Sequence, residues 1–564
     1  MRMSTAAFDE GLALATIAAA ADAGVTVFDT ARSYGPGPEQ LGHNERLLAR
    51  GIANRGDEAT ARIITKGGMA RTGGGWIPDG RARTILGDCE ASLVALGGLP
   101  IDLFLLHAPD PRTPWSTSLR ALVRAVEEGM ARRVGLSNVS RQQLDQALDL
   151  APIAAVQVAL SVFDDQALRG GVLERCMEAG VALIAHSPLG GPKRARRVGR
   201  EPVLAEVAEA SGASAPEVAL AWLLELSPLV VAIPGATRPA TARSSAAAAR
   251  LVLDQEARAR LALRFGAAKR ARPALRTPPD GGEVVIIMGI PGAGKSRVAR
   301  EYVARGYTRL NRDARGGSLR GLADTLRDLV RGGARRLVLD NTYLTRASRN
   351  HVVEAASASG LPTTCVWVDT PLAQAQVNLV ERLLARFEGL PDPETLKVQG
   401  RREPGLLLPA SQMRAQRDLE VPSEDEGFVR VERLPFARSL PSGLPTGGVF
   451  VAAAVLGKAG WEPAVEAASP TAPHLVFDWR PMGTGGDLEA ISARLASVVQ
   501  GPVVWSICPH GGGPPSCWCR PPLPGLPLAF ARANGVDASR SILVGTGVAA
   551  RTLAAALGAR YIEV

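Results

Sequence analysis

A glycine-rich loop with one lysine follows a strongly apolar segment near the middle of the chain. The segment VVIIM is followed by the loop GIPGAGKS, residues 289–296, and then by a helical pattern. Glycines let the backbone N–H groups of such a loop close around phosphate oxygens at a helix N-terminus. Lys295 would reach the β- and γ-phosphates, and Ser296 would ligate Mg²⁺. The pattern predicts an ATP·Mg²⁺ site shaped by Gly289, Gly292 and Gly294.

Three cysteines and a histidine gather in a short stretch near the C-terminus. They read Cys508-Pro-His510 and Cys517-Trp-Cys519. Three thiolates and one imidazole at this spacing suit a tetrahedral structural Zn²⁺. The alternative is a reduced surface loop, in which free thiols would be open to oxidation. The other cysteines stand alone in apolar segments and are predicted to be buried as small hydrophobic residues: Cys89, Cys176 and Cys365.

Polar residues also end six consecutive β-branched segments in the first 190 residues or so. These residues are Asp29, Lys66, His107, Ser137, Asn138, Gln157 and Ser187. One polar residue at a strand end often caps the next helix, but six strands in series ending this way favour a shared site. In (β/α)₈ enzymes the chemistry lies at the carboxyl ends of the strands.

The elements that would position these residues form a repeat of a short strand followed by an Ala/Leu-rich helix. Such alternation predicts βα units and a parallel sheet. The expected strands are Val25–Thr30, Arg62–Lys66, Leu103–His107, Arg133–Ser137, Ala155–Val158, Ala182–His186 and Val230–Ile233. An eighth strand is needed to close a barrel. We expect it to come first and to be cut short, with Met1–Thr5 as its last few residues.

The chain has 564 residues, which is too long for a single core. We expect a (β/α)₈ barrel over residues 1–266 and a Pro/Gly-rich linker over 267–282. A P-loop α/β/α domain would follow over 283–438 and a second linker over 439–448. A small α/β domain, residues 449–564, would end the chain.

The net charge of +10 is compatible with an anionic partner such as nucleic acid or nucleotide phosphates. An Arg-rich composition spread over solvated faces is the alternative. No apolar run approaches the ~20 residues of a membrane span. The Ala-rich stretch Gly11–Phe28 is interrupted by Asp22, so it predicts a helix and strand of a cytoplasmic protein and not a signal peptide.

The strand-end segments resemble the aldo-keto reductase family. The matching segments are FDTARSYG, ITKGG, LLHAPD, VGLSN, VQVALSVF, HSPLGG and IPGATRP. The resemblance implies a barrel that binds NADP(H) and reduces a small-molecule carbonyl compound. It also implies a catalytic tetrad of Asp29, Tyr34, Lys66 and His107.

These residue types suit hydride addition to a carbonyl group, which leaves an alkoxide that needs a proton. Tyr34 would give that proton, and a nearby Lys66 ammonium would lower the phenol pKa. Asp29 would hold Lys66, and His107 would orient the carbonyl oxygen.

The resemblance also assigns residues to the cofactor. Ser137, Asn138 and Gln157 would bind the nicotinamide carboxamide. Further cofactor contacts are implied for Ser187 and Leu189 of HSPLGG, and a grip on the adenosine 2′-phosphate for Gly235, Thr237 and Arg238. One alternative is a barrel that has kept its scaffold and lost its activity, because the chain starts inside the expected first strand and the segment SSAAAAR lacks the Asn expected near Ala246 that would contact adenine. Another makes the kinase the primary activity and the barrel a non-catalytic NADP(H)-binding or regulatory module.

Together with the P-loop, the segments YTRLNRD and LVLDNTYLTRASR resemble the kinase module of polynucleotide 5′-kinase/phosphatases. By this resemblance Asp313 is the general base for the acceptor hydroxyl and Asp340 lies near Mg²⁺. Arg346 and Arg349 would cover the transferred phosphoryl group. Neither Arg315 nor Arg320 aligns with the family's acceptor-site arginine, so a nucleic-acid 5′-hydroxyl end and a small alcohol both stay open as acceptors.

The last domain resembles zinc-loop phosphatases of the haloacid dehalogenase superfamily, on the segments CPHGGGPPSCWCRPPLPGL and SRSILVGTGVAARTLAAALGARYI. Their chemistry needs an Asp-x-Asp pair at the end of the first strand. The strand expected here, Val449–Leu456, has no carboxylate, and Pro521 replaces the usual lysine. We therefore expect a phosphatase fold that keeps its zinc loop and has no phosphatase activity.

Overall fold

The computed structural model describes residues 9–37, 39–72, 75–266, 282–400, 403, 405–436, 446–481, 483, 486–513 and 515–564. It divides into two compact units, Met1–Arg270 and Ala271–Val564. Three sequence predictions lie wholly or largely outside the described residues: the strand remnant Met1–Thr5 and the linkers 267–282 and 439–448.

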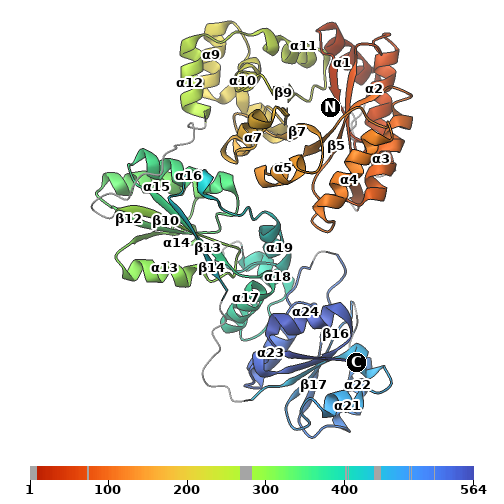
Figure 1. The fold of residues 1–564 in the computed structure, drawn as a ribbon, viewed down its shortest axis with the longest axis vertical. Coiled ribbons are helices and arrows are strands. Elements are labelled where there is room, and N and C mark those ends of the chain that lie inside the picture. The colour runs from red at the N-terminus through yellow and green to blue at the C-terminus, as the bar shows by residue number, and fades with distance from the viewer. Residues whose placement is uncertain are drawn as a thin grey trace. The chain divides into compact units, whose positions relative to one another are not determined.

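The first unit is built on a seven-stranded parallel sheet with helices outside it (Figure 1). Its strands run in the order β1 (Val27–Asp29), β2 (Arg62–Gly67), β5 (Ile101–Leu106), β6 (Val134–Ser137), β7 (Ile153–Ala159), β8 (Ala182–His186) and β9 (Val230–Ile233). All seven predicted strands are therefore present, with small shifts at their ends. Within the described part of the chain, β1 and β9 are not hydrogen-bonded to each other. The barrel is therefore nearly, but not fully, closed.

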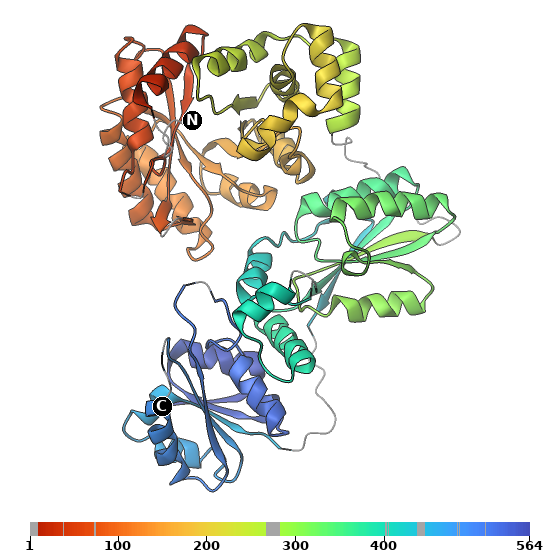
Figure 2. The same ribbon diagram turned by 180° about the vertical axis from the view of Figure 1, so that it is seen from behind.

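The helices of this unit follow the strands in alternation, and the same outer layer is visible from behind (Figure 2). They are α1 (Glu10–Asp22), α2 (His43–Ala53), α3 (Ala82–Ala95), α4 (Trp115–Glu127), α5 (Arg141–Leu148), α6 (Gln166–Arg169), α7 (Val172–Ala179), α8 (Gly191–Arg194), α9 (Pro202–Ser211), α10 (Ala215–Leu224), α11 (Pro239–Ala247) and α12 (Gln255–Phe265). Two short 3₁₀ helices are η1 (Ala195–Arg200) and η2 (Ala248–Arg250).

Local sequence signals explain where several of these helices begin. The Asp9 side chain accepts a hydrogen bond from the backbone N–H of Leu12 and so caps α1. Ser214 and Glu217 form a reciprocal capping box at the start of α10. An antiparallel hairpin of β3 (Met69–Thr72) and β4 (Gly75–Pro78), which we did not predict, follows β2.

Apolar side chains fill both sides of the barrel strands. Ile64, Leu105, Ala155 and Ile184 form a small cluster of their own. A larger cluster contains other strand residues, such as Phe104 and Leu183, together with the helices. The barrel interior is therefore packed, and its mouth is left for polar groups.

The second unit begins with a five-stranded parallel sheet. Its order is β11 (Thr308–Leu310), β12 (Arg336–Asp340), β10 (Glu283–Met288), β13 (Thr363–Asp369) and β14 (Arg430–Pro435). The helices of this part are α13 (Lys295–Ala304), α14 (Arg312–Arg315), α15 (Leu319–Arg331), α16 (Arg346–Ala358), α17 (Leu372–Phe387), α18 (Pro393–Gln399), α19 (Pro409–Arg417) and η3 (Glu424–Glu426). Alternate residues of β10 pack on opposite faces, toward α15 and α16 on one side and toward α13 on the other (Figure 1).

A second five-stranded parallel sheet ends the chain. Its order is β17 (Val503–Cys508), β16 (His474–Trp479), β15 (Val449–Ala452), β18 (Ile542–Gly545) and β19 (Arg560–Glu563). Its helices are α20 (Ala453–Leu456), α21 (Glu462–Glu466), α22 (Gly486–Ala496), α23 (Gly525–Ala533), η4 (Ala538–Arg540) and α24 (Gly547–Leu557). The strand predicted over Val449–Leu456 is shorter than expected, because its second half forms α20.

One apolar cluster joins α17 of the P-loop part to the C-terminal sheet and its helices, and in it α17 packs against α23 and α24. Trp518 Nε1 donates a 2.8 Å hydrogen bond to the carbonyl oxygen of Leu407, and Gln374 Nε2 donates one of 2.9 Å to that of Ala556. The P-loop part and the C-terminal part are therefore joined by packing and by directed hydrogen bonds.

Among the helices of the described residues, none is both long enough and apolar enough to cross a lipid bilayer.

Candidate functional site

The carboxyl ends of the barrel strands bring the predicted polar residues together. Asp29, Lys66 and His107 come from the ends of β1, β2 and β5, which are consecutive strands of the sheet. Ser137 is the last residue of β6, and Gln157 lies within β7. The two residues are register partners in the sheet. Parallel strands in this order place all five residues at one mouth of the barrel.

A buried ion pair lies at the base of this mouth. Lys66 Nζ donates hydrogen bonds of 2.7 Å to both carboxylate oxygens of Asp29 and one of 2.8 Å to the Thr30 carbonyl oxygen. Gln157 Nε2 donates a further 2.8 Å hydrogen bond to Asp29 Oδ1. Burial alone would lower the pKa of Lys66, but Asp29 and Tyr34 raise it above its ordinary value, so the ammonium stays charged. The predicted role of Asp29 as the residue that holds Lys66 agrees with these contacts.

The phenol of Tyr34 lies beside this pair. Lys66 Nζ is 5.2 Å from the centre of the Tyr34 ring. Burial raises the pKa of Tyr34 above its ordinary value of 10.0, whereas the Lys66 charge lowers it and the Asp29 charge raises it. We expected Lys66 to lower the pKa overall, and that was wrong for this structure because burial outweighs the ammonium. A protonated phenol at neutral pH is nevertheless the form that can donate a proton.

His107 stands edge-on to the tyrosine. The two ring centres are 5.6 Å apart with an interplanar angle of 76°. Burial and then the Lys66 charge lower the pKa of His107 to about 3, so the imidazole is neutral at ordinary pH. Its Nδ1 lies 3.3 Å from Ser33 Oγ. A neutral imidazole can still donate one N–H hydrogen bond to a carbonyl oxygen.

Two residues at the rim adopt the left-handed backbone conformation, which is uncommon outside glycine. They are Asn138, with φ of 58°, and Ser187, with φ of 52°. Asn138 Nδ2 donates to the carbonyl oxygen of His107 at 3.0 Å, and Asn138 Oδ1 lies 3.0 Å from His186 Nε2. Such conformations persist where surrounding contacts fix them, often at ligand sites.

The mouth opens into a cavity of about 780 Å³. Most predicted barrel-site residues line it: Asp29, Tyr34, His107, Ser137, Asn138, Gln157, Ser187, Leu189, Gly235 and Thr237. Lys66 is 1% exposed and lies behind the cavity wall, where it contacts the lining residue Asp29. Arg238 does not line the cavity; it is exposed and precedes the first residue of α11.

The cavity has lining residues that the sequence analysis did not select. Trp76, which belongs to the unpredicted hairpin strand β4, is one of them, and His186 at the end of β8 is another. The glycine run between two β-type segments, Met69–Thr72 and Trp76–Pro78, was the signal for the hairpin. Burial lowers the pKa of His186, which also keeps this imidazole neutral.

The P-loop connects β10 to α13 as predicted. Gly289 and Gly292 have φ of 147° and 86°, and a Cβ on Gly292 would lie 2.3 Å from the Ala375 carbonyl oxygen. Two carbonyl oxygens of the loop accept hydrogen bonds from side chains outside it. Asn378 Nδ2 donates to the Gly292 oxygen at 2.8 Å, and Thr370 Oγ1 donates to the Ala293 oxygen at 2.9 Å. The loop is thus fixed in a shape that only glycine permits at these positions.

The lysine of the loop is buried among backbone oxygens. Lys295 Nζ donates hydrogen bonds to the carbonyl oxygens of Gly289 and Ile290, at 3.0 and 2.9 Å. Burial lowers the pKa of Lys295 to about 8, and the charges of Asp340 and Asp313 oppose this decrease. Lys295, together with Ser296, begins α13, where backbone N–H groups are free to bind an anion.

The two kinase-like segments meet beside the loop. Asn311 Nδ2 donates to the Asp340 carbonyl oxygen at 2.5 Å, and Arg312 N donates to Asn341 Oδ1 at 2.9 Å. These contacts place Asp313, on the short helix α14, next to the end of β12. Asp313 is about half exposed, whereas Asp340 is buried and forms an ion pair with Arg309. The structure therefore brings both predicted carboxylates to the carboxyl end of the sheet, beside the P-loop.

The predicted lid arginines lie elsewhere. Arg346 is 7% exposed and forms an ion pair with Asp425, with a closest distance of 2.6 Å. Arg349 is fully buried and donates two hydrogen bonds to the carboxylate of Glu426, at 2.8 and 2.6 Å. Because both guanidinium groups are already paired, the expectation that Arg346 and Arg349 cover a phosphoryl group is corrected: their contacts tie α16 to η3.

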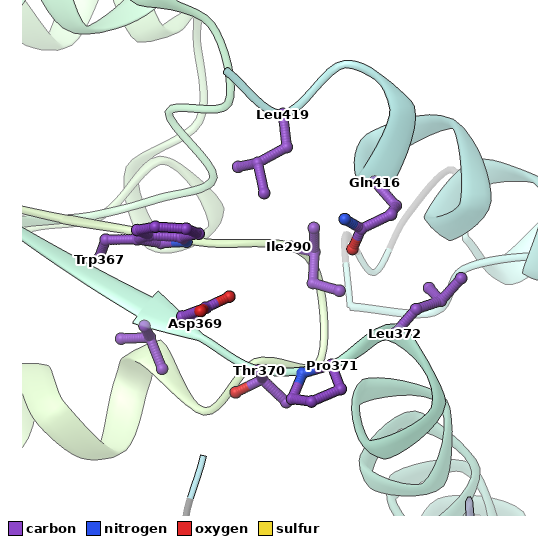
Figure 3. Close-up of a pocket in the computed structure, with 9 residues that line it drawn as sticks. Ile290, Trp367, Asp369, Thr370, Pro371, Leu372, Gln416 and Leu419 are labelled. Carbon is purple, nitrogen blue, oxygen red and sulfur yellow. The ribbon is translucent and has the colours of Figure 1, made fainter. Parts of the chain in front are cut away.

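A small cavity of about 300 Å³ lies where the P-loop leaves β10 (Figure 3). Trp367 and Asp369 of β13 form one side of it, and Gln416 of α19 and Leu419 form another. Ile290, the second residue of the loop, projects into the space between them (Figure 3). Apolar and polar groups are thus mixed beside the loop.

The four predicted zinc ligands converge in the C-terminal part. Their ligand atoms all lie within 4.8 Å of one another. Cys508 Sγ is 3.5 Å from both His510 Nδ1 and Cys517 Sγ, and Cys519 Sγ is 3.2 Å from His510 Nδ1. Tetrahedral Zn²⁺ with bonds of about 2.0–2.3 Å requires ligand separations of roughly 3.5–3.8 Å. The donor set and its geometry therefore fit one structural zinc ion. The three lone cysteines are buried as predicted: Cys89, Cys176 and Cys365.

Two family profiles match the chain. The Aldo/keto reductase family profile matches residues 1–262, and a profile described as an AAA domain matches residues 284–402.

The barrel also has relatives among known proteins. An uncharacterized oxidoreductase of Schizosaccharomyces pombe is 29% identical over 255 residues, which cover 45% of this chain and 79% of the relative. The aldo-keto reductase str7 of Strobilurus tenacellus is 30% identical over 267 residues, which cover 42% of this chain and 76% of the relative. A solved aldo-keto reductase of Klebsiella pneumoniae in complex with NADPH is 26% identical, with a TM-score of 0.40, and covers 46% of this chain and 87% of that one. By its N-terminal 262 residues the chain belongs to the aldo-keto reductase family.

Proposed function

We propose that the barrel reduces an aldehyde or ketone to an alcohol with NADP(H) as the hydride donor. The observation that carries this proposal is the buried Lys66–Asp29 pair beside Tyr34 and His107 at one cavity. A structural ion pair alone would not need a phenol and a neutral imidazole at the same mouth. The cavity, at about 780 Å³, has room for a nicotinamide ring and a small carbonyl compound.

Each residue of the tetrad has a role that its surroundings support. When bound, the nicotinamide supplies a hydride to the carbonyl carbon. Tyr34 O–H gives its proton to the carbonyl oxygen, and the Lys66 ammonium stabilises the phenolate that remains. His107 donates its N–H to the same oxygen. The phenolate then regains a proton from water, so one hydride and one proton have been added to the carbonyl group.

The rim residues fit the cofactor that the family resemblance implies. Ser137 and Gln157 are 1% and 2% exposed and line the cavity with polar groups, as a carboxamide would require. Asn138 and Ser187 are held in strained backbone conformations beside them. Arg238 and Thr237 are exposed at the start of α11, where a 2′-phosphate could meet a guanidinium group.

The test compares the native chain with Tyr34→Phe. NADPH binding, followed by fluorescence quenching, should be the same in both, because the phenol oxygen serves the chemistry. Consumption of NADPH with a panel of aldehydes and ketones should fall about 10²–10⁴-fold in the variant. If the native chain binds NADPH and turns over no carbonyl compound, the barrel is a non-catalytic NADP(H)-binding module.

We propose as a second function that the P-loop domain phosphorylates a hydroxyl group with ATP. The shaped loop, Lys295 and the adjacent carboxylates Asp313 and Asp340 support it. Lys295 and Ser296 would hold the phosphates and Mg²⁺, and Asp313, half exposed, would accept the proton of the acceptor. A 5′-hydroxyl nucleic-acid end and a small alcohol are the two acceptor classes.

ATP consumption in the presence of each acceptor class distinguishes them. A 5′-hydroxyl oligonucleotide should stimulate consumption if the acceptor is a nucleic acid, whereas sugars and alcohols should do so otherwise. Asp313→Ala should abolish the stimulated rate in either case. A rate unchanged in Asp313→Ala would remove the kinase assignment.

The C-terminal part supports a non-catalytic role within this proposal. Its all-parallel sheet, with strands on both sides of β15, suits a phosphatase-like fold. The end of β15, Ala452, and the turn into α20 carry only apolar residues where a nucleophilic carboxylate would be needed. We therefore assign this part the role of a zinc-stabilised scaffold for the P-loop domain.

A further inference from the structure

A cavity of about 640 Å³ lies between the P-loop part and the C-terminal part of the second unit. One wall comes from the loop, α13, β13, α17 and β14. The opposite wall comes from α23, η4 and α24, with Leu528, Arg532, Asp537, Ser539 and Leu557 among its residues. The volume exceeds what packing defects leave and is in the range of nucleotide and cofactor sites.

The P-loop contributes to this cavity directly. Ala293 and Gly294, the residues before Lys295, line it, and Arg297 of the first turn of α13 does too. A triphosphate bound by the loop would therefore have its nucleoside end within reach of this space. Phe436, a half-buried aromatic residue just after β14, lines the same space. Aromatic side chains are stacking surfaces for nucleobases.

The C-terminal wall carries a buried acceptor without a donor. Asp537 is 6% exposed. Its Oδ1 accepts hydrogen bonds from the backbone N–H and the hydroxyl of Ser539, both within η4, at 2.8 and 2.7 Å. Its Oδ2 accepts no hydrogen bond from any described residue, and Arg540 Nε lies 3.8 Å away. A buried carboxylate oxygen without a donor is unfavourable unless a further group supplies one.

The C-terminal wall is held in place against the P-loop domain. Gln374 of α17, which itself lines the cavity, donates to the carbonyl oxygen of Ala556 in α24 at 2.9 Å. Trp518, beside the zinc ligands, donates to Leu407 of the P-loop domain at 2.8 Å. The cavity is therefore a fixed gap between two packed surfaces.

We propose that the C-terminal part completes the nucleotide site: the nucleoside of the triphosphate occupies this cavity, with Phe436 against its base and Asp537 accepting a hydrogen bond from it. This inference rests on the proposed ATP binding by the P-loop. It gives the part without phosphatase residues a direct function in ligand binding.

The test uses the full chain and two probes, ATP and inorganic tripolyphosphate, each with Mg²⁺, in calorimetric titrations. Asp537→Asn keeps an oxygen for Ser539 and replaces the unpartnered oxygen with an NH₂ group. It should weaken ATP binding about tenfold, or about 1.4 kcal/mol, and leave tripolyphosphate binding unchanged. Ala538→Trp, which fills the cavity from η4, should weaken ATP binding more strongly and also spare tripolyphosphate.

Two controls complete the design. Lys295→Ala should weaken both probes, because it removes a phosphate contact. Glu563→Gln, an exposed residue of the same C-terminal sheet paired with Arg551, should bind both probes as the native chain does. Circular dichroism melting identifies any variant that has lost its fold.

The outcomes separate the two proposals. If Asp537→Asn and Ala538→Trp are folded and bind ATP as tightly as the native chain, the nucleoside lies elsewhere and the inference is overturned. If the native chain binds neither probe, the proposed nucleotide binding fails, and the inference fails with it. If the native chain binds tripolyphosphate as tightly as ATP, the P-loop assignment stands and the inference alone is wrong.

Discussion

The ammonium group of Lys66 contacts both carboxylate oxygens of Asp29 at 2.7 Å, in a site where Lys66 is 1% exposed. This pair joins adjacent strands of the barrel and faces the phenol of Tyr34. Taking such a charge pair out of water costs desolvation free energy, which the attraction between the charges offsets only when the geometry is good. Its place beside Tyr34 at the cavity supports the proposed role of the phenol as proton donor.

The first prediction concerns the stability of this pair. Asp29→Asn leaves the Lys66 charge buried without a counter-charge, so it should destabilise the barrel by about 3–5 kcal/mol. The double variant Asp29→Asn/Lys66→Met should recover much of that loss, because no buried charge then remains. Both changes in stability are measured by calorimetric unfolding of the full chain. The unfolding transition of the barrel is identified as the one whose temperature NADPH shifts. A double variant as unstable as the sum of the singles would contradict a direct pairing.

The second prediction concerns the pH dependence of carbonyl reduction. Burial raises the pKa of Tyr34 above 10.0, and the phenol donates its proton only below that pKa. Burial lowers the pKa of His107 to about 3, so its imidazole does not titrate near neutrality. The kcat for reduction should therefore be flat from about pH 5 to about pH 9 and fall above the pKa of the phenol. Stopped-flow or steady-state rates over this range check it, and a step near the ordinary histidine pKa would show that a titrating imidazole controls the rate.

The third prediction concerns zinc. The native chain should carry one equivalent of zinc by elemental analysis, and Cys517→Ser should lose it, because three protein ligands hold the ion less tightly than four. Loss of zinc should lower the melting temperature of the second unit, since Trp518 beside the ligands also contacts the P-loop domain. Cys365→Ser, a change at a buried cysteine outside the cluster, is the control and should keep its zinc. Native protein with no bound metal after purification in zinc-containing buffer would contradict the site.

The fourth prediction tests the corrected role of the arginines on α16. Arg349→Met leaves Glu426 buried without its partner and should cost about 3–5 kcal/mol of stability. The exposed Arg315→Met, in a helix beside the P-loop, should change stability by less than about 0.5 kcal/mol. Denaturant unfolding of the second unit measures both. A stable Arg349→Met chain with defective phosphoryl transfer would restore the lid interpretation.

The strands and motifs were predictable because their signals are local. β-branched runs located all seven barrel strands and terminal polar residues marked six of them, and the P-loop and the zinc cluster each lie within a short stretch of sequence. Most barrel-site residues could be selected for the same reason, since parallel strands bring their carboxyl ends to one mouth.

Other features depend on partners that are distant in the sequence. The pairing of Arg346 and Arg349 with Asp425 and Glu426 spans more than 70 residues, so their helical spacing alone favoured a lid. The net pKa of Tyr34 depends on burial by the whole barrel mouth, which spacing does not show. The expected strand Val449–Leu456 is an unbroken apolar run with no turn residue inside it, so nothing in the sequence indicated that it would end at Ala452 and continue as α20.

The gap between β1 and β9 should affect the local stability of the barrel. In the described part of the chain these strands share no hydrogen bonds, and an apolar gap of about 270 Å³ lies between them, with Asp29 on its wall. Outside this seam between β1 and β9, helix α1 packs against helix α11. Backbone amides along the seam should exchange with solvent sooner than those of β5 or β6. Asp29 lines both this gap and the site cavity, so we expect a bound dinucleotide to slow amide exchange along β1.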